Sequence, residues 1–275
     1  MQILDELDSA ATRIETPCGE GGMVWRVWNA GAGAPLLLLH GGSGSWRHWI
    51  RQIPRFAAER CVIAADLPGL GDSALPPEPH EPAQLAHVAA TGLPRVVGGQ
   101  AVDLVGFSFG ANVAGHVAAE AGPAIRSLLL AGAGALGIAR NVTPLEKVRD
   151  KQGEARIAAH RHNLAALMIA DPARIDALAL EIQEANMQLS RLRSRSFAGT
   201  TMLKDALART AMPLCALWGE LDHVAVGRIP ERIAALREVR PDAATLLIPG
   251  AGHWVMYEAP EEFDAALLRF LRSRP

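Results

Sequence analysis

The stretch DLVGFSFGANVAGHVAAEAG, Asp103 to Gly122, decides the fold of this chain. It begins with an apolar run typical of a buried strand, and small residues in a helical pattern begin directly after Ser108. Gly106 and Gly110 lie two residues on either side of that serine and leave room for a sharp strand-to-helix turn. Such a turn exposes the serine oxygen above a helix N-terminus, which favours a developing negative charge. The pattern therefore predicts a nucleophile elbow.

Apolar runs typical of strands alternate with helical patterns along most of the chain. The clearest runs, several of them ending in glycine-rich or proline-rich loops, are APLLLLHGG, CVIAADLPGLGDS, AVDLVGFS, AIRSLLLAG, MPLCALWGE and ATLLIPGAGH. Helical patterns lie between them, for example at 46–56, 82–90 and 109–121. This alternation predicts an α/β fold with a mostly parallel central sheet flanked by helices.

One region interrupts the alternation. From about Leu136 to Thr210 there is no strand pattern, and the segment 171–189 reads as a helix with Asp171 as its N-cap and Pro172 at its first position. We therefore predict a helical cap at 135–210, inserted into an α/β core formed by 1–134 and 211–275.

The composition narrows the class of protein. Of the 275 residues 49% are hydrophobic and 20% are charged, which is enough for a sizeable core. The formal net charge of −2 argues against nucleic acid or an anionic membrane surface as the main partner. No apolar run approaches the roughly 18 residues of a membrane helix. The N-terminus is acidic and polar, unlike a signal peptide, so we expect a cytoplasmic protein.

The spacing of the cysteines indicates whether disulfides or a structural metal site are to be expected. The three cysteines are far apart in sequence and show no zinc-finger spacing, so we expect buried thiols and neither a disulfide framework nor a metal site.

Further polar residues follow the predicted strands at the edge where Ser108 lies. The loops at the carboxyl ends of parallel strands share one edge, where ligands bind. His253 follows the last predicted strand and is the expected base, because serine needs a group that takes its proton. Asp222 follows the preceding strand and is expected to orient the imidazole. Glu220 and Asp103 are the rival carboxylates, but Glu220 comes early on its loop and Asp103 lies inside a strand.

Five motifs together resemble the α/β-hydrolase superfamily, and the resemblance covers nearly the whole chain. They are HGGSGSW at 40–46, DLPGLGDS at 66–73, GFSFG at 106–110, WGELDHV at 218–224 and GAGHWVMYEAPEEF at 250–263. The resemblance implies a catalytic triad of Ser108, Asp222 and His253. It also implies an oxyanion hole formed by the backbone N–H groups of Gly42 and Phe109, with no metal or cofactor.

Within the superfamily the chain resembles small bacterial cap-bearing serine hydrolases. These include carboxylesterases, enol-lactonases and carbon–carbon bond hydrolases of meta-cleavage products. The carbon–carbon hydrolases carry Asn before the nucleophile, where this chain has Phe107. We therefore expect hydrolysis of a small ester, a lactone or a related acyl substrate. Carbon–carbon hydrolysis is the first alternative, and a non-catalytic binding protein with the same fold is the second.

Residues beside the predicted triad suggest how a small-molecule substrate would be held. An apolar pocket is expected from Ser43, Trp46, Phe107 and Trp254. A basic run in the predicted cap forms either a solvated face or a clamp for a substrate carboxylate; its members are Arg191, Arg193 and Arg195. The oligomeric state is left open, with a homodimer as one alternative.

Overall fold

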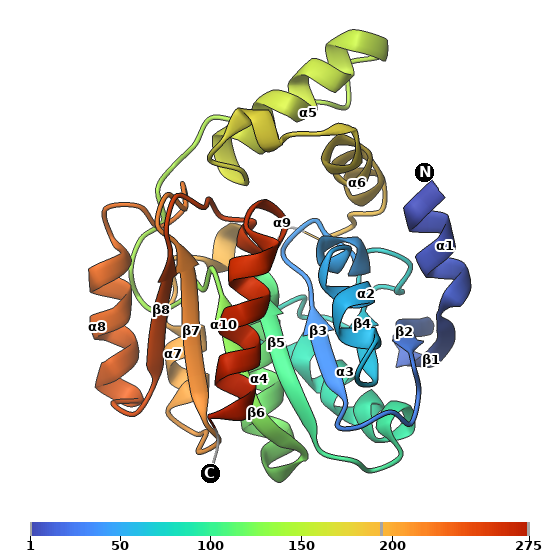
Figure 1. Ribbon diagram of the computed structural model, residues 1–275, viewed down its shortest axis with the longest axis vertical. Helices are drawn as coiled ribbons and strands as arrows, with labels where there is room; N and C mark the ends of the chain where they lie inside the picture. The colour runs from blue at the N-terminus through green and yellow to red at the C-terminus, as the bar shows by residue number, and fades with distance from the viewer. Residues whose placement is uncertain (1, 193–194, 274–275) are drawn as a thin grey trace.

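The computed structural model describes residues 2–192 and 195–273, and at its centre is one eight-stranded sheet (Figure 1). The strand order is β1-β2-β4-β3-β5-β6-β7-β8, in which β2 is antiparallel to both neighbours and every other pair is parallel. The strands are β1 Thr12–Cys18, β2 Gly21–Trp28, β3 Leu36–Leu39, β4 Val62–Ala65, β5 Val102–Phe107, β6 Ile125–Ala131, β7 Leu214–Gly219 and β8 Ala244–Ile248. The prediction of a mostly parallel sheet is confirmed.

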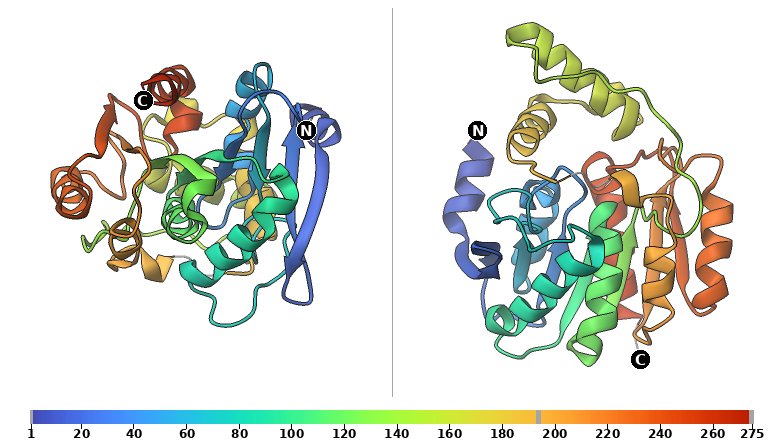
Figure 2. Two further views of the ribbon diagram at one scale, coloured as in Figure 1. Left: turned by 90° about the horizontal axis from the view of Figure 1, so that it is seen from below. Right: turned by 180° about the vertical axis from the view of Figure 1, so that it is seen from behind.

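Helices cover both faces of this sheet (Figures 1 and 2). The helices on one face are α3 Pro82–Val97, α4 Phe109–Ala121, α7 Met202–Leu207 and α8 Ile229–Val239. The helices on the other face are α2 Gln52–Ala57 and α10 Pro260–Arg272. The remaining helices and 3-10 turns are α1 Gln2–Ala10, α5 Gly153–Leu167, α6 Ala177–Gln188, α9 Val255–Glu258, η1 Trp46–Trp49, η2 Gly122–Ala124, η3 Pro172–Arg174 and η4 Arg195–Phe197.

The central strands contribute side chains to both helix layers. In β3, Leu37 and Leu39 pack into one hydrophobic cluster, whereas Leu36 and Leu38 pack into the cluster on the opposite face. Successive side chains of a strand point to opposite faces, so a strand covered on both sides must be apolar at every position. This is why the sequence shows uninterrupted apolar runs here.

The segment between β6 and β7 holds helices and, in its described residues, no strand. In Figure 1, α5 and α6 lie above the carboxyl ends of the parallel strands. By contrast, α7 packs beside α4 and α8 in the layer on the sheet. The division of the chain into a core and a cap at 135–210 stays a prediction.

The helix expected over 171–189 is interrupted. The Asp171 side chain accepts a hydrogen bond from the Ala173 N–H, but it caps only the 3-10 turn η3. The helix α6 begins at Ala177, and Asp176 caps it by accepting from the Ala179 N–H at 2.8 Å. Two capping aspartates five residues apart therefore divide the segment into a turn and a helix.

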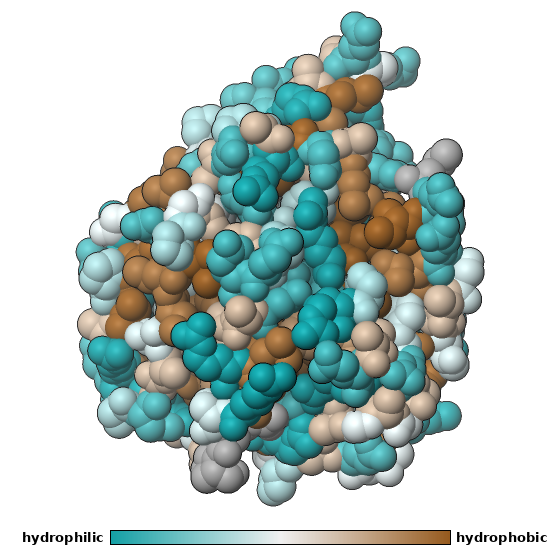
Figure 3. All heavy atoms as spheres, viewed as in Figure 1, coloured by the Kyte–Doolittle hydropathy of each residue, from teal (hydrophilic) through white to brown (hydrophobic). Residues whose placement is uncertain are grey.

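Hydrophobic residues gather on the surface of the molecule where α1, α2 and α6 approach one another (Figure 3). A groove of ≈ 630 Å³ in this region is lined by residues that include Ile3, Ile50 and Leu178.

The corner between β5 and α4 is closely packed against the end of β3. A Cβ atom at Gly110 would lie 2.2 Å from the carbonyl oxygen of His40 and 2.6 Å from that of Leu39. A Cβ atom at Gly106 would lie 2.5 Å from the carbonyl oxygen of Gly110 and 2.7 Å from the Cα atom of Ala111. Both positions therefore require glycine, because backbone atoms cannot move aside as a flexible side chain can.

We predict that Gly110→Ala lowers the free energy of unfolding by about 3 kcal/mol or more, because the new methyl group forces α4 away from β3. Chemical denaturation at equilibrium measures the change. The matched control is Gly199→Ala: Gly199 is exposed, and its added Cβ would meet only the Ala139 Cα atom, at 4.0 Å. Equal stability of the two variants would contradict the packing argument.

Candidate active site

Ser108 lies at the corner itself, between the last residue of β5 and the first residue of α4. Its backbone has φ 53° and ψ −114°, a combination that side-chain-bearing residues rarely adopt. Such a conformation costs on the order of 1–3 kcal/mol and persists only where the surroundings impose it. One such constraint is the hydrogen bond that the Ser108 N–H donates to the carbonyl oxygen of Ala131, at 2.8 Å.

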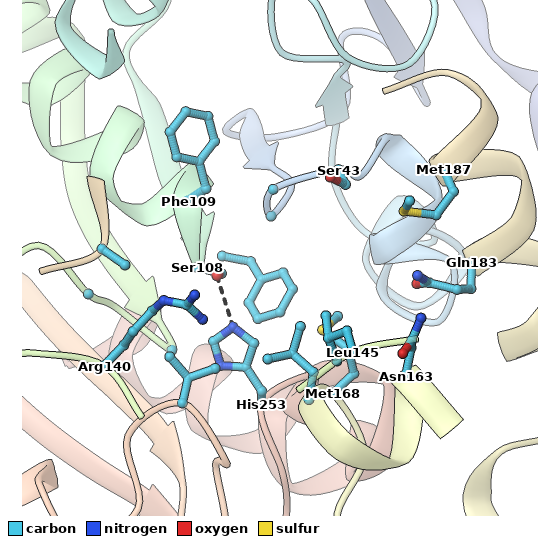
Figure 4. A pocket seen from close by; sticks show the side chains of 18 of the residues that line it. Ser43, Ser108, Phe109, Arg140, Leu145, Asn163, Met168, Gln183, Met187 and His253 are labelled. Atoms are coloured by element: carbon cyan, nitrogen blue, oxygen red, sulfur yellow. Dashed lines mark hydrogen bonds between the residues drawn. The ribbon is translucent and has the colours of Figure 1, made fainter. Parts of the chain in front are cut away.

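Ser108, His253 and Asp222 form a continuous hydrogen-bonded chain. The Nδ1 atom of His253 is 2.8 Å from Oδ2 of Asp222, and its Nε2 atom is 2.8 Å from Oγ of Ser108 (Figure 4). The carboxylate can only accept, so the imidazole proton belongs on Nδ1 and the lone pair of Nε2 faces the serine hydroxyl. His253 is 4% exposed and Asp222 is fully buried. This arrangement can remove the serine proton as the oxygen attacks an electrophile.

The rival carboxylates have other partners. Glu220 is exposed and accepts a hydrogen bond from the Gly250 N–H at 3.0 Å. Asp103 is buried in β5 and forms ion pairs with Arg60 and Arg126. Of the three acidic residues considered from the sequence, only Asp222 contacts His253.

Two backbone N–H groups lie beside Ser108 without an acceptor. Phe109 is the first residue of α4, so its N–H has no intrahelical partner. Among the described residues, neither the Phe109 N–H nor the Gly42 N–H donates a hydrogen bond, and both residues line the same cavity as Ser108. They are thus free to bind a negatively charged oxygen.

Two buried histidines hold the loop that carries Gly42. His40 approaches the carbonyl oxygen of Gly41 through Nδ1 at 2.7 Å and accepts from the Leu67 N–H at 2.9 Å. His48 accepts from the Gly41 N–H through Nδ1 at 3.2 Å. Burial, followed by repulsion from His40 and His253, lowers the pKa of His48 well below its ordinary value. His48 therefore stays neutral and keeps the lone pair with which it holds Gly41.

A cavity of ≈ 470 Å³ opens beside Ser108 and His253 and extends under α5 and α6. Figure 4 shows Met168, Leu145 and Met187 along it, with Asn163 and Gln183 at the end away from Ser108. Both polar atoms of the Asn163 side chain already have partners. Its Oδ1 atom accepts from the backbone N–H of Glu146, and its Nδ2 atom donates to the carbonyl oxygen of Glu146. The cavity thus combines a reactive polar end with a mainly apolar middle.

Two of the four residues expected to line the pocket do so, namely Ser43 and Phe107. Trp46 and Trp254 do not line it, and both are fully buried. Trp46 packs against Trp28, with ring centroids 5.8 Å apart. Trp254 stacks on Tyr257 at 4.2 Å and donates its indole N–H to the carbonyl oxygen of His48. The predicted pocket role of these two tryptophans is therefore wrong, because tertiary packing places both rings in the core.

Among the described residues, the basic run in the predicted cap provides no clamp for a substrate carboxylate in the cavity. Arg191 donates to the carbonyl oxygens of Gly71 and Ser73 and does not line the cavity. Arg193 and the side chain of Arg195 lie outside the described part of the chain. The cavity instead contains Arg140, which sequence reasoning missed because nothing in its own stretch of sequence distinguishes it.

Asn112 is a second cavity residue that the sequence analysis missed. It lies one turn after Ser108 in α4, is 3% exposed, and its Oδ1 atom has no hydrogen-bond partner among the described residues. Its position four residues after the nucleophile, on the same face of the helix, is a signal that could have found it.

Glu258 connects the loop that carries His253 with the residues that follow α5. Its Oε2 atom accepts from the Gly252 N–H at 2.7 Å and the Ala170 N–H at 3.0 Å, and its Oε1 atom accepts from the Asp171 N–H at 2.7 Å. The carboxylate is 4% exposed. One buried side chain therefore fixes both the loop that carries His253 and the residues that follow α5.

The described residues contain no group of three or more His, Cys, Asp or Glu side chains placed to hold a metal ion. None of the described helices is both long and apolar enough to cross a membrane. The three cysteines, Cys18, Cys61 and Cys215, are free and buried.

Comparison with known proteins places this geometry in context. A family model described as "Alpha/beta hydrolase family" matches residues 36–266. The dihydrolipoyllysine-residue acetyltransferase component of the acetoin cleaving system from Pseudomonas putida is 33% identical, over 92% of this chain and 68% of that protein. The 2-hydroxy-6-oxo-6-(2'-aminophenyl)hexa-2,4-dienoic acid hydrolase of Metapseudomonas resinovorans is 26% identical, over 99% and 95%. A crystal structure of an esterase from Rhodococcus sp. ECU1013 has the same fold, with a TM-score of 0.76 at 22% identity, over 97% of this chain and 100% of that chain.

We predict that Glu258→Gln lowers the free energy of unfolding by about 2 kcal/mol, because an amide cannot accept all three N–H groups and leaves at least one unpaired. Denaturant titration measures the loss. Glu262→Gln is the control, since Glu262 is exposed on α10, and it is expected to change stability by less than about 0.5 kcal/mol. Equal effects of the two changes would show that the buried contacts contribute nothing.

Proposed function

The chain belongs to the alpha/beta hydrolase family, and we propose that it is a serine hydrolase of small carboxylic esters, lactones or related acyl substrates. The observation that carries this proposal is the hydrogen-bonded chain from Asp222 through His253 to Ser108 beside a cavity. In the proposed triad Ser108 is the nucleophile, His253 the base and Asp222 the group that orients the imidazole.

The first half of the reaction forms an acyl-enzyme. Oγ of Ser108 attacks the carbonyl carbon while Nε2 of His253 takes the hydroxyl proton. The carbonyl oxygen becomes an oxyanion, which the N–H groups of Phe109 and Gly42 bind in the proposed oxyanion hole. The carbon–oxygen bond of the ester then breaks, and His253 returns the proton to the leaving alkoxide. In a lactone the new alcohol stays attached to the acyl group.

The second half releases the acid. Water enters the site of the leaving alcohol and gives a proton to His253 as its oxygen attacks the acyl carbon. The tetrahedral intermediate collapses, the bond to Oγ breaks, and the proton returns to Ser108. The negative charge of buried Asp222 stabilises the imidazolium in both halves. The proton transfers between Ser108 and His253 join two atoms that lie 2.8 Å apart.

The names of the relatives support chemistry at an acyl carbon. The Pseudomonas putida relative is named for transfer of an acetyl group, and the Metapseudomonas resinovorans relative for hydrolysis of an oxo-dienoic acid. The second name keeps carbon–carbon hydrolysis as the alternative function. We favour acyl substrates because Phe107, which precedes the nucleophile, presents a ring where the carbon–carbon hydrolases carry an amide. A dienone acid and a short 4-nitrophenyl ester, assayed side by side, distinguish the two activities.

We predict that Ser108→Ala lowers turnover of a short 4-nitrophenyl ester by on the order of 10⁴-fold, because the nucleophile is lost. A fluorophosphonate probe is expected to label the wild type at Ser108 and to leave the variant unlabelled. Ser9→Ala is the control, as Ser9 is exposed on α1. Labelling at another residue, or full activity in Ser108→Ala, would refute the assignment. Failure of the wild type to turn over any ester or take up the probe would favour the non-catalytic binding protein.

The acid is tested by a matched pair of substitutions. Asp222→Asn is expected to reduce kcat by roughly 10⁴-fold, because the amide favours the wrong imidazole tautomer. Glu220→Gln should cost less than about tenfold, since the carboxylate of exposed Glu220 bonds the Gly250 N–H and, among the residues that the structure describes, has no contact with His253. Steady-state kinetics on the same ester compare the two variants. If the losses are reversed, Glu220 is the acid.

A further inference from the structure

Arg140 contributes a positive charge to the cavity beside the proposed nucleophile. Its guanidinium points toward Ser108 and His253 in Figure 4, and all three residues line the same cavity. Among the described residues no acidic or acceptor group pairs with Arg140 through a hydrogen bond or an ion pair, although its side chain is half-buried. A cation that is partly removed from water and has no counter-charge is unfavourable, so it favours binding of an anion.

The backbone around Arg140 is held by the loop that carries Asp222. The N–H of Asn141 donates to the carbonyl oxygen of Val224 at 3.1 Å, and its side chain donates to the carbonyl oxygens of His223 and Val226. The guanidinium of Arg232 contacts the carbonyl oxygen of Ala139 at 3.5 Å and that of Val224 at 3.2 Å. The position of Arg140 is thus fixed relative to the proposed triad.

Other arginines with buried or half-buried side chains have partners in the described structure. Arg26 bonds the carboxylates of Asp8, Asp66 and Asp72. Arg156 forms a two-point ion pair with Glu184. The guanidinium of Arg140 differs from those of these arginines, because it has no partner among the described residues. Since it points toward Ser108, it lies where a substrate would bind.

Carboxylates elsewhere on the cavity wall do not neutralise Arg140. Glu146 pairs with Lys151 at 2.8 Å, and Asp150 is exposed. Lys147 and Arg149 are also exposed on the wall and add positive charge to the segment that carries Arg140. The electrostatic field on this side of the cavity therefore favours a negatively charged ligand group.

We propose that Arg140 binds a carboxylate of the substrate, so that the preferred substrate is an ester or lactone that carries a free carboxylate near its scissile carbonyl. This inference rests on the proposed hydrolase function and specifies its substrate class. The planar guanidinium can donate two parallel hydrogen bonds to a carboxylate, which would fix both the position and the orientation of the substrate.

The test compares esters that differ only in charge. One set consists of mono-4-nitrophenyl esters of glutaric, adipic and pimelic acids, each paired with the neutral ester in which a methyl group replaces the carboxylate. A further pair, 4-acetoxybenzoate and 4-methylphenyl acetate, places the charge on the leaving group. For the wild type we expect kcat/KM to favour the charged member of at least one pair by about tenfold or more.

Arg140→Gln is expected to reduce that preference by roughly tenfold to a hundredfold, because the charge-assisted hydrogen bonds are lost. Arg140→Lys should restore part of it, since charge returns without the two-point geometry. Arg95→Gln is the matched control, because Arg95 is exposed on α3 and does not line the cavity. A wild type that hydrolyses both members of every pair equally well, or equal losses for both members of every pair in Arg140→Gln, would overturn the proposal.

Binding without turnover separates this proposal from the proposed function. Calorimetric titration of Ser108→Ala protein with the same esters is expected to show tighter binding of the charged member, by about tenfold. The double variant Ser108→Ala/Arg140→Gln should lose this difference. A wild type that hydrolyses none of the esters, combined with this binding preference, would refute the hydrolase and leave the carboxylate site standing. Hydrolysis combined with equal binding of both members would refute the carboxylate site alone.

Discussion

The site depends on one close contact, the approach of the α4 N-terminus to the end of β3. The absence of a side chain at Gly110 lets the helix lie directly against the carbonyl oxygens of Leu39 and His40. This packing leaves Ser108 no relaxed conformation and holds it at a positive φ. The free energy for that strained conformation comes from the surrounding sheet, whose central strands are buried on both faces. The same contact brings the N–H of Phe109 and the loop of Gly42 to one end of one cavity.

Hydrogen bonds between loops complete the site. The carboxylate of Glu258 and the hydrogen bond from the backbone N–H of Trp254 to the carbonyl oxygen of Met168 tie the loop of His253 to the residues that follow α5. On the other side, the Ser45 hydroxyl donates to Asn186 of α6 at 2.6 Å. The helical segment between β6 and β7 is therefore attached to both loops that flank Ser108. A change in its position would alter the reactive end of the cavity as well as the substrate pocket.

The strand-to-helix corner and the alternation of elements could be predicted from the sequence because each rests on local patterns. The run before Ser108, its two glycines and the helix from Phe109 to Ala121 agree with the structure residue by residue. The polar edge strand β1 was not predicted, because its residues Thr12–Cys18 lack an apolar run and are stabilised by pairing with β2. The same limit explains the error at Trp46 and Trp254, whose aromatic character fits a pocket and a core equally well.

The sequence by itself determined the six parallel strands of the sheet, the elbow and the three residues that the structure brings into one hydrogen-bonded chain. These features depend on apolar periodicity, on glycine where no side chain fits, and on polar residues at strand ends. Each of these patterns can be recognised within a short stretch of the sequence. Only the tertiary structure decided which side chains enter the cavity. Arg140 lies in an irregular segment and reaches the site because Asn141 bonds a loop more than 80 residues further along the chain. No local pattern encodes such a contact, because its free energy depends on surfaces that meet only after the chain has folded.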